Sequence, residues 1–363
     1  MDRAETFNFS AGPSCLPTPV LERAASELVN FRGSGLSVME MSHRSREYQD
    51  IFDETKAKLR AALSIPETHE ILFLQGGASL QFSMVPLNLT AEGDTADYAV
   101  TGHFARVAEK EAEKYCRVHI ACSSEEEKYV RVPTQQELTI DPASKYFYYC
   151  ANNTIFGTAW NYVPETNGVP LVCDMSSEIL SKPVDVSRYA LIFAGAQKNM
   201  APAGLTVVIL DKSIAGHERA ITPLMMSYQT MIDKDSMLNT PPCYNIYMLD
   251  LVLDWVREQG GVEGMARLKR ERSKLVYDYL EESRLFTAIA EKESRSEMNA
   301  VFRTPSAELD AEFVKFTVEH GMRNLKGHRV AGGMRASMYN AMPVEGAVRL
   351  VELMKEFEAK HHV

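Results

Sequence analysis

The sequence lacks three features that define large classes of proteins: cysteine pairs, an excess of basic residues and long apolar runs. Its six cysteines include no C-x-x-C pair and several lie inside apolar runs, so we expect buried reduced thiols and no metal site. The net charge of −10 argues against nucleic-acid or membrane-surface binding, because both partners select for basic surfaces. No apolar run approaches the roughly 20 residues of a membrane span, and no secretory signal is visible at the start. We therefore expect a cytoplasmic protein with neither nucleic acid nor membrane as partner.

What the sequence contains is a regular alternation of strand and helix signals. Short apolar runs typical of buried strands occur at residues 71–74, 98–100, 146–150, 171–173, 191–194 and 205–210. Helical spacing of apolar residues occurs at 21–28, 51–63, 262–282 and 345–360. This order predicts an α/β fold with a mostly parallel sheet and crossover helices.

The 363 residues are enough for two domains, and the pattern of apolar and charged residues changes at Gly260-Gly261. A long charged helix follows these glycines. We expect a large domain over residues 1–260 and a smaller C-terminal α/β domain over 261–363, with residues 1–15 packed on the smaller one. No flexible linker or repeat is evident, so the domains are expected to pack firmly together.

A lysine and an aspartate follow two of the predicted strands. Lys198 comes shortly after the run 190–194, and Asp174 ends the run 169–173. If these strands are parallel neighbours, they deliver an amine and a carboxylate to one edge of the sheet. Pyridoxal 5′-phosphate requires this pair, because the amine binds its aldehyde and the carboxylate keeps its ring nitrogen protonated.

A glycine-rich turn, residues 75–81, follows the strand 71–74 and precedes a helix. Backbone N–H groups at such a turn, the Ser79 hydroxyl and the helix dipole together favour a phosphate. A turn that binds nothing explains the glycines equally well. The segment matches neither the P-loop pattern nor G-x-G-x-x-G.

Two further residues follow strand ends. Phe104 comes after the strand 98–100 and can stack on a flat cofactor ring, although a place in the core explains an aromatic residue more simply. Thr154 follows Asn152 and Asn153 and can donate a hydrogen bond to the cofactor's phenolic oxygen. An Asn-rich turn explains it nearly as well.

Basic residues gather in two separate segments. Arg44 follows His43, and Lys326, His328, Arg329 and Arg335 lie among glycines within residues 326–335. In an acidic chain this suggests an anion pocket, because a guanidinium binds carboxylate or phosphate through two parallel N–H groups. For any single arginine, a solvated surface position is an equally good explanation.

Five motifs resemble the phosphoserine aminotransferase family, and the match runs nearly from end to end. They are Phe7-Asn8-Phe9-Ser10-Ala11-Gly12-Pro13, Ser37-Val38-Met39-Glu40-Met41-Ser42-His43-Arg44, Gly195-Ala196-Gln197-Lys198-Asn199, Asn239-Thr240-Pro241-Pro242 and Gly327-His328-Arg329 with Gly332-Gly333-Met334-Arg335-Ala336-Ser337. The resemblance implies a class V aminotransferase of pyridoxal-phosphate fold type I. Its expected reaction moves an amino group between L-glutamate and 3-phosphohydroxypyruvate, giving O-phospho-L-serine and 2-oxoglutarate in L-serine biosynthesis.

The resemblance also implies roles for individual residues in a homodimer with shared active sites. Lys198 and Asp174 would be catalytic, and the cofactor would be held by these two and by Ala78, Ser79, Phe104, Thr154, Gln197, Asn239 and Thr240, the last two from the other subunit. Substrate would be bound by His43, Arg44, His328, Arg329 and Arg335, some of them from the partner chain. Two positions depart from some family members, which have tryptophan in place of Phe104 and arginine in place of Ser79.

Three alternatives stay open at this point. A class V enzyme acting on alanine, serine or glyoxylate would keep Lys198 and Asp174 but has less use for a second anion site. A cysteine desulfurase needs a nucleophilic cysteine late in the chain, and no cysteine follows Cys243. A non-catalytic cofactor-binding protein would not need both Lys198 and Asp174.

Overall fold

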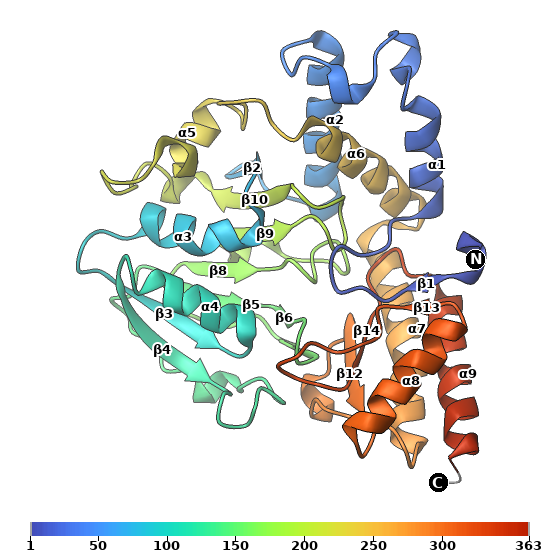
Figure 1. The fold of residues 1–363 in the computed structure, drawn as a ribbon. Coiled ribbons are helices and arrows are strands. Elements are labelled where there is room, and N and C mark those ends of the chain that lie inside the picture. Colours follow the sequence, from blue (N-terminus) through green and yellow to red (C-terminus); the bar gives the residue numbers. More distant parts are fainter. Residues whose placement is uncertain (1, 362–363) are drawn as a thin grey trace.

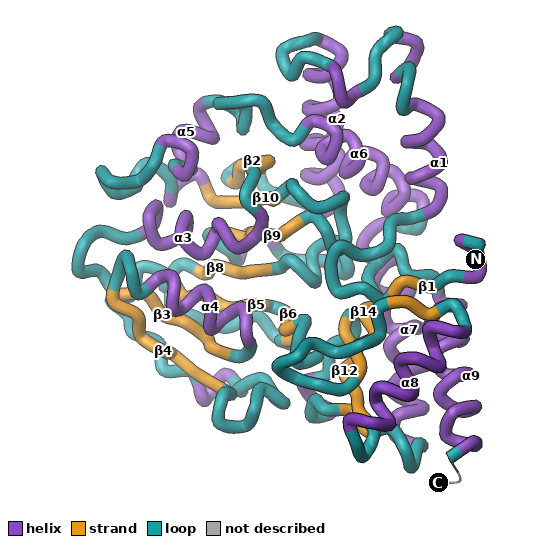
Figure 2. The backbone as a smooth tube through the Cα atoms, in the orientation of Figure 1, coloured by secondary structure: helices purple, strands orange, loops and turns teal. Residues whose placement is uncertain are grey.

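A seven-stranded sheet forms the centre of the computed structural model, which describes residues 2–361. Its strand order is β2-β10-β9-β8-β5-β3-β4. The bounds are β2 (His69–Leu74), β3 (Thr95–Val100), β4 (Arg117–Ser123), β5 (Phe147–Cys150), β8 (Leu171–Asp174), β9 (Leu191–Gly195) and β10 (Thr206–Asp211). Strand β10 is antiparallel to both of its neighbours, and the other neighbouring pairs are parallel. All strands of this sheet except β10 therefore end at the same edge, which faces the C-terminal part of the chain (Figures 1 and 2).

Helices cover both faces of this sheet. Alternate residues of β2 point to opposite sides, so Ile71 and Phe73 join one apolar cluster while Leu72 and Leu74 join another. The first cluster contains residues of α1 (Thr18–Glu27), α2 (Arg46–Leu63) and α6 (Cys243–Glu258). The second contains residues of α3 (Gly77–Leu89), α4 (His103–Ala112) and α5 (Tyr228–Asp233). Burial on both faces explains why the central strands are continuous apolar runs.

The C-terminal part builds a third apolar cluster on a smaller antiparallel sheet. Its strands are β11 (Thr287–Ala288), β12 (Asn299–Arg303) and β14 (Met334–Ser337), in that order. Helices α7 (Gly261–Glu282), α8 (Ala307–Glu319) and α9 (Val344–Lys360) pack around it. The N-terminal strand β1 (Phe7–Asn8) pairs in parallel with β13 (Met322–Arg323), so the start of the chain lies on this part (Figure 1).

The expected strands and helices are present, with ends that shift by a few residues. The short hairpin of β6 (Asn152–Asn153) and β7 (Thr158–Ala159) and the strand β4 were not expected. Strand β4 lies at the sheet edge, and the exposed Arg117 and the polar His119 lie among its apolar residues and weaken its strand signal. The domain boundary at Gly260 stays a prediction, because α7 contributes Met265 to the first cluster and Val276 to the third.

Within residues 2–361, no helix is long and apolar enough to cross a membrane.

Candidate active site

Lys198 and Asp174 lie at the ends of two adjacent parallel strands. Asp174 is the last residue of β8, where it pairs with Phe193 of β9. Strand β9 ends at Gly195, and Lys198 follows in the next turn. The two side chains therefore leave the sheet at the same edge, as the strand pattern predicted.

The Asp174 carboxylate is buried, with 4% of the residue exposed. Its Oδ1 accepts a 2.8 Å hydrogen bond from the backbone N–H of Ser176, whose hydroxyl in turn accepts one from Gly195. Burial raises the pKa of Asp174, while hydrogen bonding by Ser176 and the positive charge of Lys198 oppose this shift. No ion pair involves Asp174 within residues 2–361, so a positively charged ligand atom would give this carboxylate a counter-charge. Ser176 was not predicted, although its place two residues after a strand-ending aspartate is a usable signal.

The Lys198 amine lies between a hydroxyl and an aromatic ring. Its Nζ donates a 2.8 Å hydrogen bond to Oγ1 of Thr154 and lies 5.7 Å from the centre of the Phe104 ring. Gly12 approaches from the N-terminal segment, where a Cβ atom would lie 3.6 Å from Cγ of Lys198. Among the described residues, no carboxylate forms an ion pair with this amine, which leaves it available to a ligand carbonyl.

Neighbouring segments hold the backbone around Lys198. Ser14 donates from its backbone N–H to the Gln197 carbonyl at 2.9 Å and from its hydroxyl to the Lys198 carbonyl. The Asn199 side chain accepts a 3.1 Å hydrogen bond from the backbone of Asn340. The Gln197 side chain folds back over Gly195, where a Cβ atom would lie 2.6 Å from its Oε1. Segments far apart in sequence thus fix the turn that carries the lysine.

The glycine-rich turn opens helix α3 at the same edge of the sheet. Gly76 has φ of +90°, and a Cβ atom there would lie 2.4 Å from the Leu80 side chain, so the turn requires glycine. Ala78 and Ser79 lie in the first turn of α3, and Ser79 is exposed. This places free N–H groups and a hydroxyl where an anion can bind.

Asn239 and Thr240 lie beside the start of this turn in the same chain. The Gln75 side-chain amide donates to the Thr240 carbonyl at 3.1 Å and to Oδ1 of Asn239 at 3.4 Å. Both residues are exposed. Their predicted contribution to a partner's cofactor stays a prediction.

A group of basic side chains, one arginine and two histidines, lies next to Thr154 and Phe104. Nη1 of Arg335, on β14, lies 3.4 Å from the Thr154 carbonyl oxygen, and its buried Nε has no acceptor within residues 2–361. The His328 ring lies 5.9 Å from that of His103, which itself contacts Phe104. Burial lowers the pKa of His328, and the charges of Arg335, His103 and Arg329 add to this effect. Sequence reasoning overlooked His103, although it directly precedes Phe104 at the start of α4.

Within residues 2–361, neither Arg335 nor Arg329 forms an ion pair with an acidic side chain. The described part of the protein therefore does not neutralise their positive charges. Burial lowers the pKa of Arg335. The arrangement is suited to a dianionic ligand, because such a ligand would supply the missing negative charge.

His43 and Arg44 lie away from this group in the chain. They form the turn before α2, and Arg44 is exposed. Figure 1 shows the segment between α1 and α2 at the top of the view, apart from the loop before β14. Within one chain the structure therefore does not bring these two predicted residues to Lys198.

Comparison with known proteins decides which family has this site. The sequence matches the aminotransferase class-V family over residues 6–350. It is also 50% identical to phosphoserine aminotransferase of Bacillus cereus over 355 residues, which are 98% of this chain and 99% of that protein. The chain belongs to the phosphoserine aminotransferase family.

Solved structures of this family have the same fold. Phosphoserine aminotransferase from Bacillus circulans subsp. alkalophilus superposes with a TM-score of 0.97 at 43% identity, covering 99% of both chains. The pyridoxal-phosphate-bound phosphoserine aminotransferase from Trichomonas vaginalis gives a TM-score of 0.93 at 37% identity, covering 96% of this chain and 99% of that one. The predicted fold type, the transaminase class and the cofactor, pyridoxal 5′-phosphate, are confirmed.

The residues present in this phosphoserine aminotransferase family member fit the cofactor. Asp174 is a buried carboxylate that can neutralise a protonated ring nitrogen, and Lys198 is an amine without an ion-pair partner in the described residues. The turn at Gly76 offers backbone N–H groups to a phosphate. Residues 2–361 contain no group of three metal-ligating side chains.

Proposed function

We propose that the protein transfers an amino group reversibly between L-glutamate and 3-phosphohydroxypyruvate, giving O-phospho-L-serine and 2-oxoglutarate for L-serine biosynthesis. The observation that carries this proposal is the group of Arg335, Arg329 and His328 beside Lys198. A transaminase that handles only singly charged substrates has no use for two unpaired arginines and a histidine at this place. Glutamate and the phosphorylated acid share a carboxylate at one end and a second anionic group at the other.

The proposed roles of the cofactor-binding residues follow from their places at the sheet edge. Lys198 would hold the cofactor and, once released from it, move a proton to and from the substrate Cα. The cofactor, when bound, supplies an electron sink, which Asp174 maintains by keeping the ring nitrogen protonated. Phe104 would lie against the ring and Thr154 would face its phenolic oxygen. The cofactor phosphate would be bound by Ala78, Ser79 and Gln197, with Asn239 and Thr240 of the partner subunit.

Arg335 is our candidate for binding the substrate α-carboxylate. Its contact with the Thr154 carbonyl places it next to the hydroxyl that holds the Lys198 amine. His328 and Arg329, with His43 and Arg44 of the partner subunit, would bind the distal phosphate or the glutamate side-chain carboxylate. Because an arginine presents two parallel donors, it distinguishes a dianionic phosphate from a hydroxyl.

Exposed apolar residues support a homodimer with shared sites. Val29 is 81% exposed, Met39 60%, Ile221 67% and Leu224 63%. Their segments lie between α1 and α2 and ahead of α5, toward the upper side of the molecule in Figure 1. Apolar side chains as exposed as these would be covered where two copies associate.

Three finer assignments belong to the same proposal. The large domain would end at residue 260 and the small domain would cover 261–363. The enzyme would act in the cytoplasm, where its cysteines stay reduced. A second phosphorylated 2-oxo acid, from pyridoxine biosynthesis, would use the same cationic group.

A paired substrate assay tests the proposed function. The holoenzyme is given L-glutamate with either 3-phosphohydroxypyruvate or hydroxypyruvate, and kcat/KM is measured for each. We expect a preference of at least about 100-fold for the phosphorylated acid, since charge-assisted pairs to phosphate are lost with hydroxypyruvate. Equal rates with the two acids would instead favour a general class V aminotransferase.

A further inference from the structure

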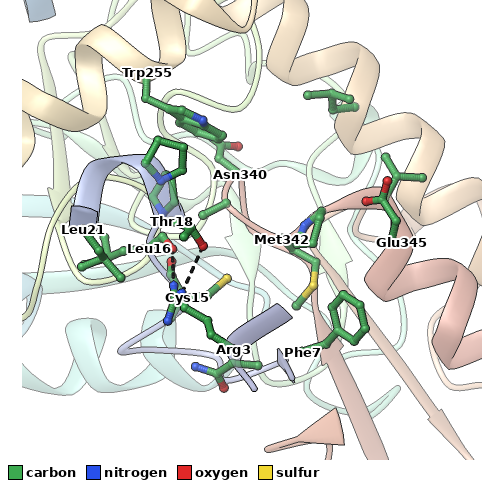
Figure 3. A pocket seen from close by; sticks show the side chains of 18 of the residues that line it. Arg3, Phe7, Cys15, Leu16, Thr18, Leu21, Trp255, Asn340, Met342 and Glu345 are labelled. Atoms are coloured by element: carbon green, nitrogen blue, oxygen red, sulfur yellow. Dashed lines mark hydrogen bonds between the residues drawn. The ribbon is translucent and has the colours of Figure 1, made fainter. Parts of the chain in front are cut away.

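A cavity of about 890 Å³ lies between the N-terminal segment and the C-terminal part (Figure 3), and its lining includes Ser14 and Asn340, which contact the turn that carries Lys198. Figure 3 shows Trp255 on one side and Arg3 on the other, with Leu21 and Glu345 at the flanks. None of the residues assigned above to cofactor or substrate lines it. Its volume is within the range of small-molecule sites and is far larger than a single water needs.

Arg272 of α7 lines this cavity and is 1% exposed. Its Nη1 donates a 2.8 Å hydrogen bond to the Met342 carbonyl. Its Nε and Nη2 are buried and have no acceptor within residues 2–361. These two nitrogens form the side edge of the guanidinium, where two N–H bonds point in parallel. This edge matches the two oxygens of a carboxylate or phosphate.

Within residues 2–361, no acidic side chain forms an ion pair with Arg272. Glu345 is the one acidic residue among those lining the cavity, and it is exposed and forms no ion pair with Arg272. Glu271, its neighbour on α7, is exposed as well. Arg3 also lines the cavity and donates to the Leu16 carbonyl and the Thr18 hydroxyl, so it adds positive charge. Burying an unpaired cation is costly unless a counter-charge enters with it.

Burial lowers the pKa of Arg272 to about 10, while the negative charges of Cys15, when ionised, and Glu271 oppose the shift. Burial likewise raises the pKa of the Cys15 thiol, so this neighbour is uncharged near neutral pH. The side chains near Arg272 therefore do not offset the free-energy cost of burying its charge.

We propose that this cavity is a second anion-binding site, in which Arg272 turns its Nε and Nη2 edge, buried in this structure, toward the carboxylate or phosphate group of a small molecule. The carbon skeleton of the ligand would lie against the apolar part of the lining, which includes Phe7, Leu21, Trp255 and Leu268. The site shares no residue assigned to cofactor or substrate with the proposed active site, although Ser14 and Asn340 of its lining also hold the turn that carries Lys198.

Crystals of the holoenzyme soaked in sodium selenate test the site directly. We expect an anomalous selenium peak within hydrogen-bond distance of Nε and Nη2 of Arg272. In solution, calorimetric titration at constant ionic strength uses acetate and inorganic phosphate as separate probes. Binding of acetate alone identifies a carboxylate ligand, binding of phosphate alone identifies a phosphate ligand, and binding of both identifies a general oxyanion site.

Variants separate this site from the active site, which can also bind these probes. Arg272→Met removes the charge at similar length and is expected to lose one binding event per chain, whereas Arg270→Met, exposed on the same helix, keeps it. Arg272→Lys keeps a positive charge but lacks the two parallel N–H donors of the guanidinium. We expect this variant to bind the probe anions at least about 10-fold more weakly than wild type. If Arg272→Met does not fold, the Arg272→Lys variant and the selenate-soaked wild-type crystal still show whether Arg272 binds an anion.

Three results would overturn the proposal. The first is the absence of selenium at Arg272 in the crystal. The second is a dissociation constant above about 10 mM for both probes, too weak for a cellular ligand. The third is a holoenzyme crystal in which a protein segment of the partner subunit fills the cavity.

Discussion

The Lys198 amine and the Thr154 hydroxyl are joined by a hydrogen bond of 2.8 Å. The carbonyl oxygen of the same threonine lies 3.4 Å from Nη1 of Arg335. Thr154 thus connects the residue proposed to do the chemistry with the residue proposed to hold the substrate. The three come from different parts of the fold: the turn after β9, the hairpin after β5 and strand β14 of the small sheet.

Replacing Thr154 by valine tests this connection. Thr154→Val keeps the shape but removes the acceptor of the Lys198 amine, and a hydrogen bond to a charged group contributes about 1.5–3 kcal/mol. We expect kcat to fall about 10- to 100-fold. The pH at which the visible absorption of the holoenzyme changes should also shift. Thr154→Ser keeps the hydroxyl and should restore both properties; a serine variant as impaired as the valine one would show that packing alone is responsible.

Lys198 should carry the cofactor covalently. Reduction of the holoenzyme with borohydride, followed by peptide mass spectrometry, should place the label on Lys198. Lys198→Ala should still bind the cofactor but lose transamination by at least about 1,000-fold, because it loses both the attachment point and the base. The matched variant Lys212→Ala changes an exposed lysine and should behave as wild type. A label on another lysine would disprove the assignment.

Asp174 should make the stability of the apoenzyme depend on pH. Burial raises its pKa, so the folded protein holds this proton more tightly than the unfolded chain does. The stabilisation is therefore present below the unfolded value of about 4 and is lost as the pH rises through the raised folded value. Thermal unfolding midpoints between pH 4 and 7 should fall less steeply with pH in Asp174→Asn than in wild type.

The same Asp174→Asn variant should bind the cofactor more weakly, because the protonated ring nitrogen loses its counter-charge. Asp50→Asn, at an exposed position, is the control for both measurements. If the unfolding midpoints of wild type and Asp174→Asn changed in parallel with pH, this would contradict a pKa of Asp174 raised by burial.

Arg335 should bind both substrates through the carboxylate that they share. Arg335→Lys keeps the charge but loses the two parallel donors, so KM for glutamate and for the keto acid should both rise about 10- to 100-fold. Arg303→Lys changes an exposed arginine on the same small sheet and should have no effect. A rise in KM for one substrate alone would assign Arg335 to the distal group.

Subunit mixing should reveal whether sites are shared. Lys198→Ala and Arg44→Leu are each expected to be inactive. If Arg44 serves the partner's site, an equal mixture refolded together contains hybrid dimers with one intact site, and about a quarter of wild-type activity returns. If both residues serve the same chain, no activity returns.

The strands and the lysine and aspartate at their ends could be predicted from sequence because the signals are local. An apolar run that ends in a polar residue indicates a buried strand and its end, and parallel neighbours place these ends together. Strand β4 was not predicted because Arg117 and His119 lie among its apolar residues, whereas the other edge strand, β2, has a continuous apolar run. Ser176 and His103 were not predicted because their roles depend on residues that contact them only in the folded chain. These are Gly195 for Ser176 and His328 for His103.

The sequence by itself determined the α/β class, the family motifs and the positions of Lys198 and Asp174. Only the tertiary structure decided that β14 brings Arg335 to Thr154, that Ser14 holds the Lys198 backbone and that Arg272 is buried with no ion-pair partner among residues 2–361. The reason is physical. Periodicity and turn chemistry act over neighbouring residues, whereas these contacts join segments more than a hundred residues apart and form only when the chain is packed.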